Sequence, residues 1–183
     1  MRIALVGYGR MGKMVEQVAT ARGHEISAKF DINNNVAGEG LTEESLKGTD
    51  VVVDFSVPDA VLENVRKVLS LGVPVVVGAT GWQANLDEVK ELVAERQGAL
   101  VWSANFSLGV NLFFRVVKYA GELFSRFAEY DPFILEHHHK FKVDAPSGTG
   151  WILERELAGS YDRKIAAPVS IRAGFEPGMH EVG

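Results

Sequence analysis

The residues best suited to chemistry lie between positions 136 and 149. Three consecutive histidines, residues 137–139, are followed by Lys140 and Lys142, and Ser147-Gly148-Thr149 comes after a turn sequence. An imidazole has an ordinary pKa of about 6.5, so it can give or take a proton at neutral pH. Lysine ammonium groups and the N–H groups at the start of a helix both attract carboxylates and phosphates. The stretch therefore predicts an anion pocket that contains a titratable group.

The same stretch has two other interpretations. It is also typical of a solvated polar loop in which Ser147 only caps a helix. A metal site would need converging histidines, but neighbours on a strand point to opposite faces, so only His137 and His139 could share an ion. No carboxylate lies at an obvious complementary spacing. We therefore expect no metal.

We expect a strand before this stretch and a helix after it. The apolar run Phe133-Ile134-Leu135 predicts a strand that delivers the histidines to a sheet edge, and a helix is expected from about Ser147 to Leu157. A long apolar helix, from Val110 to about Phe127, should come before them. Alternation over residues 169–174 predicts a further strand, with residues 178–182 as its antiparallel neighbour.

A second chemical motif opens the chain. The short strand Ile3-Ala4-Leu5-Val6 leads directly into Gly7-x-Gly9-x-x-Gly12 and a helical pattern, and the next strand ends on Asp31, nineteen residues after Gly12. The dinucleotide-binding fingerprint has this order, with glycines that allow a tight turn and close approach of a pyrophosphate to a helix N-terminus. An acid about 20 residues further on completes it. The context predicts a dinucleotide site.

Strands and helices alternate up to residue 102, which predicts an α/β fold with a Rossmann-type doubly wound parallel sheet. The junctions at residues 7–12, 55–56 and 78–81 would share the carboxyl edge of that sheet, where ligands bind. The polar segment 103–109 is interpreted as a hinge. We expect a dinucleotide-binding domain at residues 1–107 and a small α+β lobe with a mixed sheet at residues 108–183.

Composition limits the classes of function. The chain has 183 residues, a net charge of −5, 46% hydrophobic residues and no cysteine. The negative charge argues against nucleic-acid binding, and the absence of cysteine excludes disulfides and thiolate metal sites. No apolar run approaches the ~20 residues that span a bilayer, and the amino-terminal apolar run is too short for a signal peptide. We expect a cytoplasmic protein that does not bind membranes.

Together these residues resemble the 4-hydroxy-tetrahydrodipicolinate reductase (dihydrodipicolinate reductase) family. The most specific part of the similarity is Glu136-x-His138-His139-x-x-Lys142-x-Asp144-Ala145-Pro146-Ser147-Gly148-Thr149. The segments that also fit are residues 6–12, 54–56, 78–81, 104–111, 171–174 and 180–182. The similarity thus extends along nearly the whole chain.

The resemblance implies nicotinamide-dependent reduction of 4-hydroxy-tetrahydrodipicolinate to tetrahydrodipicolinate, in the diaminopimelate route to lysine. It makes His138 the catalytic proton donor and Lys142 its electrostatic partner, and it gives His137 no role. The substrate's carboxylates would be held by His139, Lys142, Ser147, Gly148 and Thr149. The cofactor would be surrounded by Gly7, Gly9, Arg10, Met11, Gly12, Asp31, Phe55, Gly78, Thr80, Ala104, Asn105 and Phe106.

Asp31 bears on the choice of cofactor. A carboxylate at the end of the second strand accepts hydrogen bonds from the adenosine ribose and repels a 2′-phosphate, and the next two residues carry no positive charge. We therefore expect NADH to be preferred and NADPH to remain usable. Arg10 and Lys13 could reach toward a 2′-phosphate, but solvent would screen them.

The resemblance also bears on partners and on the extent of the chain. The expected partner is a small dicarboxylate substrate, and family members form homotetramers through the second lobe. They also continue for several further strands and a helix, so we expect a member that is shortened at its C-terminus. Two alternatives stay open. One is another NAD(P)-dependent dehydrogenase of the same architecture, which lacks the histidine stretch. The other is a cofactor-binding module without catalysis.

Overall fold

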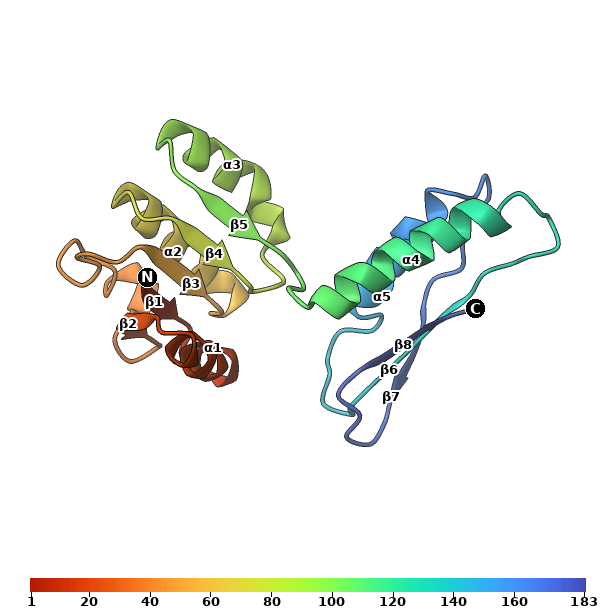
Figure 1. The fold of residues 1–183 in the computed structure, drawn as a ribbon, viewed down its shortest axis with the longest axis horizontal. Helices are drawn as coiled ribbons and strands as arrows, with labels where there is room; N and C mark the ends of the chain where they lie inside the picture. The colour runs from red at the N-terminus through yellow and green to blue at the C-terminus, as the bar shows by residue number, and fades with distance from the viewer. The chain divides into compact units, whose positions relative to one another are not determined.

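The computed structural model describes residues 1–183 and divides them into two compact units, residues 1–104 and 105–183 (Figure 1). The sequence prediction put the boundary at 107/108, within the same polar connection. Each unit has a sheet of its own and a buried apolar core of its own.

The first unit is a parallel α/β structure. Its elements are β1 (Arg2–Val6), α1 (Arg10–Ala21), β2 (Glu25–Phe30), β3 (Val51–Asp54), α2 (Pro58–Ser70), β4 (Val75–Val77), α3 (Leu86–Glu95) and β5 (Leu100–Trp102), with short 3₁₀ turns η1 (Val36–Gly38) and η2 (Gln83–Asn85). The strand order is β2-β1-β3-β4-β5, and every neighbouring pair is parallel. The predicted Rossmann-type sheet is confirmed.

Valine-rich strands and one apolar helix face build the core of this unit. Val52 on β3 and Val77 on β4 are fully buried, as expected where both faces of a sheet are covered. α2 turns Val61, Val65 and Val68 inward, and the spacing of three or four residues explains why they share one face. The packed sheet brings the carboxyl ends of its strands to one edge, where the glycine turns lie.

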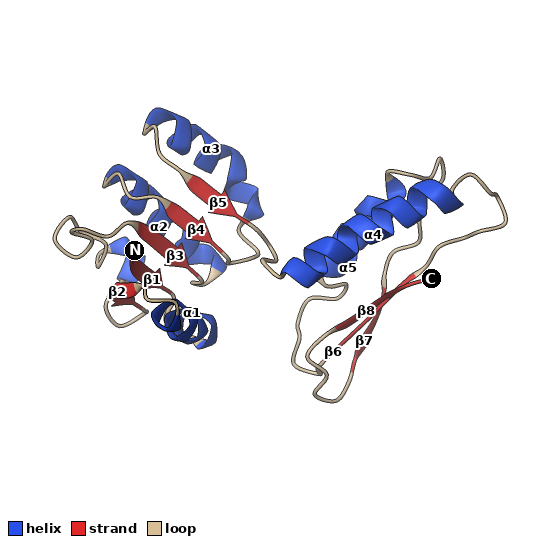
Figure 2. Cartoon of the chain, in the orientation of Figure 1, coloured by secondary structure: helices blue, strands red, loops and turns tan.

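The second unit has two helices and a three-stranded mixed sheet (Figure 2). Its elements are α4 (Leu108–Phe124), β6 (Ile134–His138), α5 (Gly148–Ala158), β7 (Val169–Arg172) and β8 (Met179–Val182). Val117 of α4 and Leu153 and Leu157 of α5 pack with Ile134 of β6 and Ile165 to form its core. α4 is the longest helix at 17 residues. A membrane-spanning segment is not found among the helices.

The strand arrangement of the second unit differs from one prediction. The histidine strand β6 is the central strand: β7 pairs with it in parallel on one side and β8 antiparallel on the other. Residues 169–174 and 178–182 were predicted to pair with each other, and this is wrong. The short connection between β7 and β8 passes the end of β6 instead, so both strands bond to β6. Alternation along a strand fixes which face is buried but does not identify its neighbour.

Candidate active site

A cavity of about 350 Å³ lies at the carboxyl ends of β1, β2 and β3 in the first unit. It is lined by Val6, Gly7, Tyr8, Gly9, Phe30, Asp31, Ile32, Asn35, Phe55, Ser56, Val57, Ala60 and Asn64. This is the edge at which doubly wound sheets bind ligands. Four of the predicted cofactor residues, Gly7, Gly9, Asp31 and Phe55, therefore meet around one cavity.

The three fingerprint glycines have different surroundings. Gly7 has φ +79°, and a Cβ there would lie 2.4 Å from the backbone nitrogen of Ser56. A Cβ on Gly12 would lie 2.7 Å from the Gly7 carbonyl oxygen, so packing within the protein explains both glycines. A Cβ on Gly9 would meet nothing within 4 Å. The open space beside Gly9 is where the fingerprint lets a pyrophosphate approach the backbone.

The beginning of α1 suits an anion. The helix starts at Arg10, no side chain caps it, and its first turn contains no acidic residue. The N–H groups of the first turn have no acceptor within the helix, and the helix dipole adds partial positive charge there. Arg10, Met11 and Gly12 form this turn. The residues present thus fit the pyrophosphate of a nicotinamide dinucleotide.

Asp31 lies at the rim of this cavity and is held by its own loop. Its Oδ1 accepts a 2.8 Å hydrogen bond from the Asn33 N–H, and its N–H donates to Asn34 Oδ1, also at 2.8 Å. No lysine or arginine forms an ion pair with Asp31. The nearby Lys29 is paired with Glu16 at 2.5 Å. No basic side chain is therefore paired with this carboxylate beside the cavity.

A buried carboxylate holds the loop that carries Phe55. Asp54 is fully buried and accepts hydrogen bonds from the Ser56 N–H at 2.7 Å and from Asn64 Nδ2 at 3.0 Å. Burial raises the pKa of Asp54, while these hydrogen bonds oppose that rise. The Phe55 ring lies against Gly78, where a Cβ would overlap it at 2.1 Å. The absence of a side chain at Gly78 therefore allows the Phe55 ring to take this position.

The remaining predicted cofactor residues lie outside this cavity. Thr80 is exposed in the turn after β4. Ala104, Asn105 and Phe106 form the connection between the two units, and about half of Phe106 is exposed. The contact of these four residues with a cofactor stays a prediction.

In the second unit, the buried carboxylate of Glu136 is the centre of a polar cluster. Both of its oxygens accept from Arg172: Nη1 donates to Oε2 at 3.0 Å, and Nη2 donates to Oε1 at 2.6 Å. The Ser147 N–H also donates to Oε1, at 3.2 Å. Burial would raise the pKa of Glu136, but the guanidinium and the other hydrogen bonds hold it at about 2. The carboxylate is therefore ionised at neutral pH.

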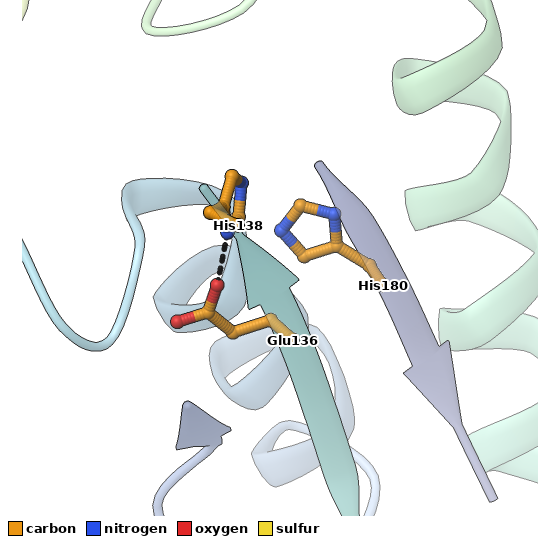
Figure 3. Close-up of side chains that lie close together, drawn as sticks. All are labelled: Glu136, His138 and His180. Atoms are coloured by element: carbon orange, nitrogen blue, oxygen red, sulfur yellow. Dashed lines mark hydrogen bonds and ion pairs between the residues drawn. The ribbon is translucent and has the colours of Figure 1, made fainter. Parts of the chain in front are cut away.

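His138 lies next to both Glu136 and His180, and the three side chains converge (Figure 3). Its Nδ1 is hydrogen-bonded to Glu136 Oε2, because residues two apart on a strand share a face. His180 of β8 is the register partner of Glu136, and its ring centroid lies 5.1 Å from that of His138. Burial, followed by the charge of His138, lowers the pKa of His180. His138 is 8% exposed.

Some of the polar groups at the start of α5 already form hydrogen bonds within the protein. Ser147 is buried, and its hydroxyl accepts from the Gly150 N–H at 3.1 Å and exchanges a 3.1 Å hydrogen bond with His180 Nε2. The Ser147 N–H donates to Glu136, so its backbone donor is already engaged, and contact of its hydroxyl with a substrate stays a prediction. The Thr149 hydroxyl forms no hydrogen bond within the protein and remains available, beside the exposed Gly148.

Lys142 and His139 lie in the turn between β6 and α5. Lys142 Nζ forms a 2.7 Å ion pair with Asp144 Oδ1, and its N–H donates to the His139 carbonyl. Burial opposes ionisation of Asp144, but Lys142 and the Gly148 N–H lower its pKa. Nδ1 of His139 is buried without a hydrogen-bond partner. An ammonium ion and an unpaired ring nitrogen are groups that a carboxylate ligand could engage.

Three residues of this cluster had no predicted role: Glu136, Arg172 and His180. The signal for Glu136 was its spacing of two from His138 on a predicted strand, which places both side chains on one face. Arg172 and His180 come from strands whose pairing with β6 could not be read from the sequence. His137 lies on the other face and approaches the Ala173 carbonyl with Nε2 at 3.2 Å.

Glu136, His138 and His180 also offer ligand atoms within 4.8 Å of one another, as in some metal sites. The guanidinium of Arg172 already contacts both oxygens of the carboxylate, however. A cation placed among these groups would lie next to that positive charge. We therefore assign no metal to the cluster.

A parallel Rossmann-type sheet with a cavity at the carboxyl ends of its strands, followed by a second unit with a mixed sheet and a histidine–lysine cluster, is the class of α/β protein that the structure defines. Residues 1–106 match the family description "Dihydrodipicolinate reductase, N-terminus", and residues 109–183 match "Dihydrodipicolinate reductase, C-terminus". The chain belongs to the dihydrodipicolinate reductase family.

Curated relatives named 4-hydroxy-tetrahydrodipicolinate reductase agree with this assignment. The chain is 36% identical to the protein of Christiangramia forsetii over 157 residues, which are 86% of this chain and 64% of the relative. It is 35% identical to the protein of Archaeoglobus fulgidus over 200 aligned positions, covering 100% of this chain and 76% of that relative. The chain thus spans about two thirds to three quarters of the length of these two relatives.

Solved structures support the fold. A dihydrodipicolinate reductase from Paenisporosarcina sp. TG-14, solved with bound dipicolinate, superposes with a TM-score of 0.76 at 22% identity, covering 100% of this chain and 82% of that one. Aspartate semialdehyde dehydrogenase II from Vibrio cholerae gives a TM-score of 0.58 at 10% identity, covering 99% and 70%. The second match shows that the architecture is shared with other enzymes.

Proposed function

We propose that this chain catalyses the nicotinamide-dependent reduction of 4-hydroxy-tetrahydrodipicolinate to tetrahydrodipicolinate in the diaminopimelate route to lysine. The observation that carries the proposal is His138 at the end of β6, bonded to an ionised carboxylate and followed by Lys142 and the start of α5. Family membership and the names of the curated relatives support it.

The roles in the second unit follow from the charges. The substrate carries two carboxylates, which Lys142, His139, Gly148 and Thr149 would hold, with Ser147 shaping the helix start beneath them. A reduced nicotinamide, when bound, supplies the hydride. His138 delivers the proton that must meet the negative charge developing on the substrate, a contribution of ~10²–10⁴-fold for a general acid.

In the first unit, Gly7, Gly9 and the first turn of α1 would hold the cofactor's pyrophosphate, and Asp31 the adenosine ribose. NADH is the preferred cofactor, because Asp31 has no basic partner and would repel a 2′-phosphate. Lys29, the basic residue two positions earlier on β2, is tied to Glu16.

Self-association through the sheet of the second unit belongs to the same proposal. α4 and α5 cover one face of this sheet, as Figure 2 indicates. On its other face Val169 is 59%, Ile171 41% and Met179 45% exposed. An apolar sheet face of this kind suits contact with a second copy of the chain.

The activity is tested directly with the purified chain. The condensation product of pyruvate and aspartate semialdehyde is added together with NADH, and oxidation of NADH is followed by absorbance. We expect turnover that requires both compounds. Binding of NADH without turnover would instead indicate a cofactor-binding module, and turnover with an amino acid and NAD⁺ would indicate another dehydrogenase.

A further inference from the structure

The two ring nitrogens of His138 have different environments. Nδ1 is hydrogen-bonded to Glu136 Oε2, and Glu136 is fixed on its other sides by Arg172 and by the Ser147 N–H. An ionised carboxylate can only accept hydrogen bonds. Nδ1 must therefore carry a hydrogen, both in the imidazolium and in the neutral ring.

Nε2 of His138 faces the backbone of Gly178, where a residue with a side chain would crowd the ring. Gly178, in the connection between β7 and β8, has φ +150°, and a Cβ there would lie 3.0 Å from Nε2 and 3.1 Å from Cδ2 of His138. Any side chain at this position would lie against the nitrogen that Glu136 does not occupy. Gly174, in the same connection, has φ +60° but would meet nothing within 4 Å.

We propose that Glu136 and Gly178 are positioning residues that make Nε2 of His138 the one atom from which the proton is delivered. Glu136 fixes the hydrogen on Nδ1, and Gly178 keeps Nε2 clear for the substrate. The inference rests on the proposed function in taking His138 as the proton donor. It adds the atom that acts and the two residues that select it.

Proton transfer from His138 breaks one N–H bond and leaves the bond to Glu136 intact. The N–H bond at Nε2 of the imidazolium breaks, and the proton goes to the substrate, which has gained an electron pair with the hydride. The ring becomes neutral and keeps its Nδ1–H, still donated to Glu136. No rearrangement of the ring or change of tautomer is needed, so the carboxylate and the ring can remain in place throughout.

Other charged groups around His138 do not replace Glu136. His180 of β8 contacts the ring by its edge at a centroid distance of 5.1 Å, and its own Nε2 is bonded to Ser147. Arg172 of β7 reaches Glu136 and the Asp144 carbonyl, and Lys142 pairs with the Asp144 carboxylate. Glu136 is thus the group to which the His138 ring is hydrogen-bonded.

The first test determines which ring nitrogen of His138 carries the hydrogen in the neutral form, and it needs no substrate. In the full chain labelled with ¹⁵N, we expect the neutral form of His138 to show a protonated Nδ1 and an unprotonated Nε2 by two-dimensional NMR. In Glu136→Gln, Arg172 and Ser147 compete for the single carbonyl oxygen, which turns the amide NH₂ toward Nδ1 and moves the hydrogen to Nε2. Glu181→Gln, at an exposed position of β8, should leave the wild-type tautomer. A wild-type ring protonated on Nε2 overturns the proposal.

The second test compares the two glycines and remains decisive if Glu136→Gln does not fold. Gly178→Ala should lower kcat at least ~10-fold, the size typical of a disturbed supporting residue, with the KM for NADH unchanged. Gly174→Ala also places an alanine at a positive φ, in the same connection but without contact to the ring, and should keep near-wild-type kcat. Equal kcat in the two variants would overturn the role of Gly178. If the wild type lacks turnover, the proposed function fails, whereas the NMR test of Glu136 still stands.

Discussion

His138 differs from the other four histidines of the chain in what holds its ring. One nitrogen is bonded to a buried, ionised carboxylate, and the other faces Gly178. His137 approaches a backbone carbonyl on the opposite face, and Nδ1 of His139 has no partner. At the scale of single residues, these environments separate a candidate acid from its sequence neighbours.

The charge of Lys142 should contribute more to substrate binding and turnover than the hydroxyl of Thr149. Lys142→Ala is expected to raise the KM for the substrate and to lower kcat, because an ammonium is felt in both the bound and the transition state. Thr149→Val should cost only ~1.5–3 kcal/mol of binding, about one hydrogen bond to a charged group. Steady-state kinetics measures both.

Lys140→Ala is the control for this comparison, since the Lys140 ammonium lies over the rings of Phe141 and Phe175 at 5.1 and 5.2 Å. It should leave KM and kcat close to those of the wild type. A loss for Thr149→Val as large as that for Lys142→Ala would mean that the helix start, and not the lysine, dominates anion binding.

Asp31→Asn tests the choice of cofactor at the rim of the first cavity. The wild type should have a lower KM for NADH than for NADPH, and the substitution should narrow that ratio because it removes a like charge near the 2′-phosphate. Asp50→Asn, a change of the same kind at a residue bonded to the Arg2 N–H, should leave the ratio as it is. A wild-type preference for NADPH contradicts the account, as does an unchanged ratio in Asp31→Asn.

At the scale of elements, the first unit was predictable and the second only in part. Each strand and helix up to Trp102 has its own periodic pattern and a short connection, so order and direction follow from the chain. In the second unit β6, β7 and β8 were recognised as strands, but their pairing was not. Which strands pair depends on the path that the chain takes around β6. The alternation of apolar and polar residues along a strand does not indicate this path.

The same limit explains which site residues were missed. The motif from Glu136 to Thr149 is local in sequence, so residue types and spacing predicted an anion pocket there, and the family resemblance selected His138, His139 and Lys142 within it. Arg172 and His180 reach Glu136 and His138 only across strand pairs. The engagement of Ser147 with Glu136 and His180 depends on these contacts too.

The ion pair between β6 and β7 should make stability depend on pH. The pKa of Glu136 is lowered from 4.5 to about 2 in the folded protein. A lowered pKa gives stability that is complete above the unfolded value and is lost as pH falls through the folded value. The free energy of unfolding should therefore fall as pH is lowered from 4.5 to 2.

Urea unfolding at several pH values, in the wild type and in Glu136→Gln, measures this dependence. The wild type should lose more stability over that interval than the variant, in which residue 136 cannot titrate. Asp144, Glu16 and Asp87 also have lowered pKa values, but they contribute equally to both proteins. The difference between the wild-type and variant curves therefore isolates residue 136. Parallel curves for the two proteins would show that the buried pair does not contribute in this way.

At the scale of the whole molecule, the exposed sheet face of the second unit predicts self-association. Val169→Lys should shift sedimentation velocity toward a smaller species, because burying an unpaired ammonium in an interface is costly. Val101→Lys, at a valine of similar exposure in the first unit, should leave the distribution unchanged. Identical sedimentation of Val169→Lys and the wild type would exclude this face as the contact.

The central claim is that His138 supplies the proton for hydride reduction of a dicarboxylate. The most direct measurement is the turnover of His138→Ala beside the wild type and His137→Ala, in the assay with NADH and the condensation product of pyruvate and aspartate semialdehyde. The account predicts a loss of at least ~100-fold for His138→Ala, an unchanged dissociation constant for NADH, and near-normal turnover for His137→Ala. Near-full turnover of His138→Ala, with loss in His137→Ala instead, would contradict it.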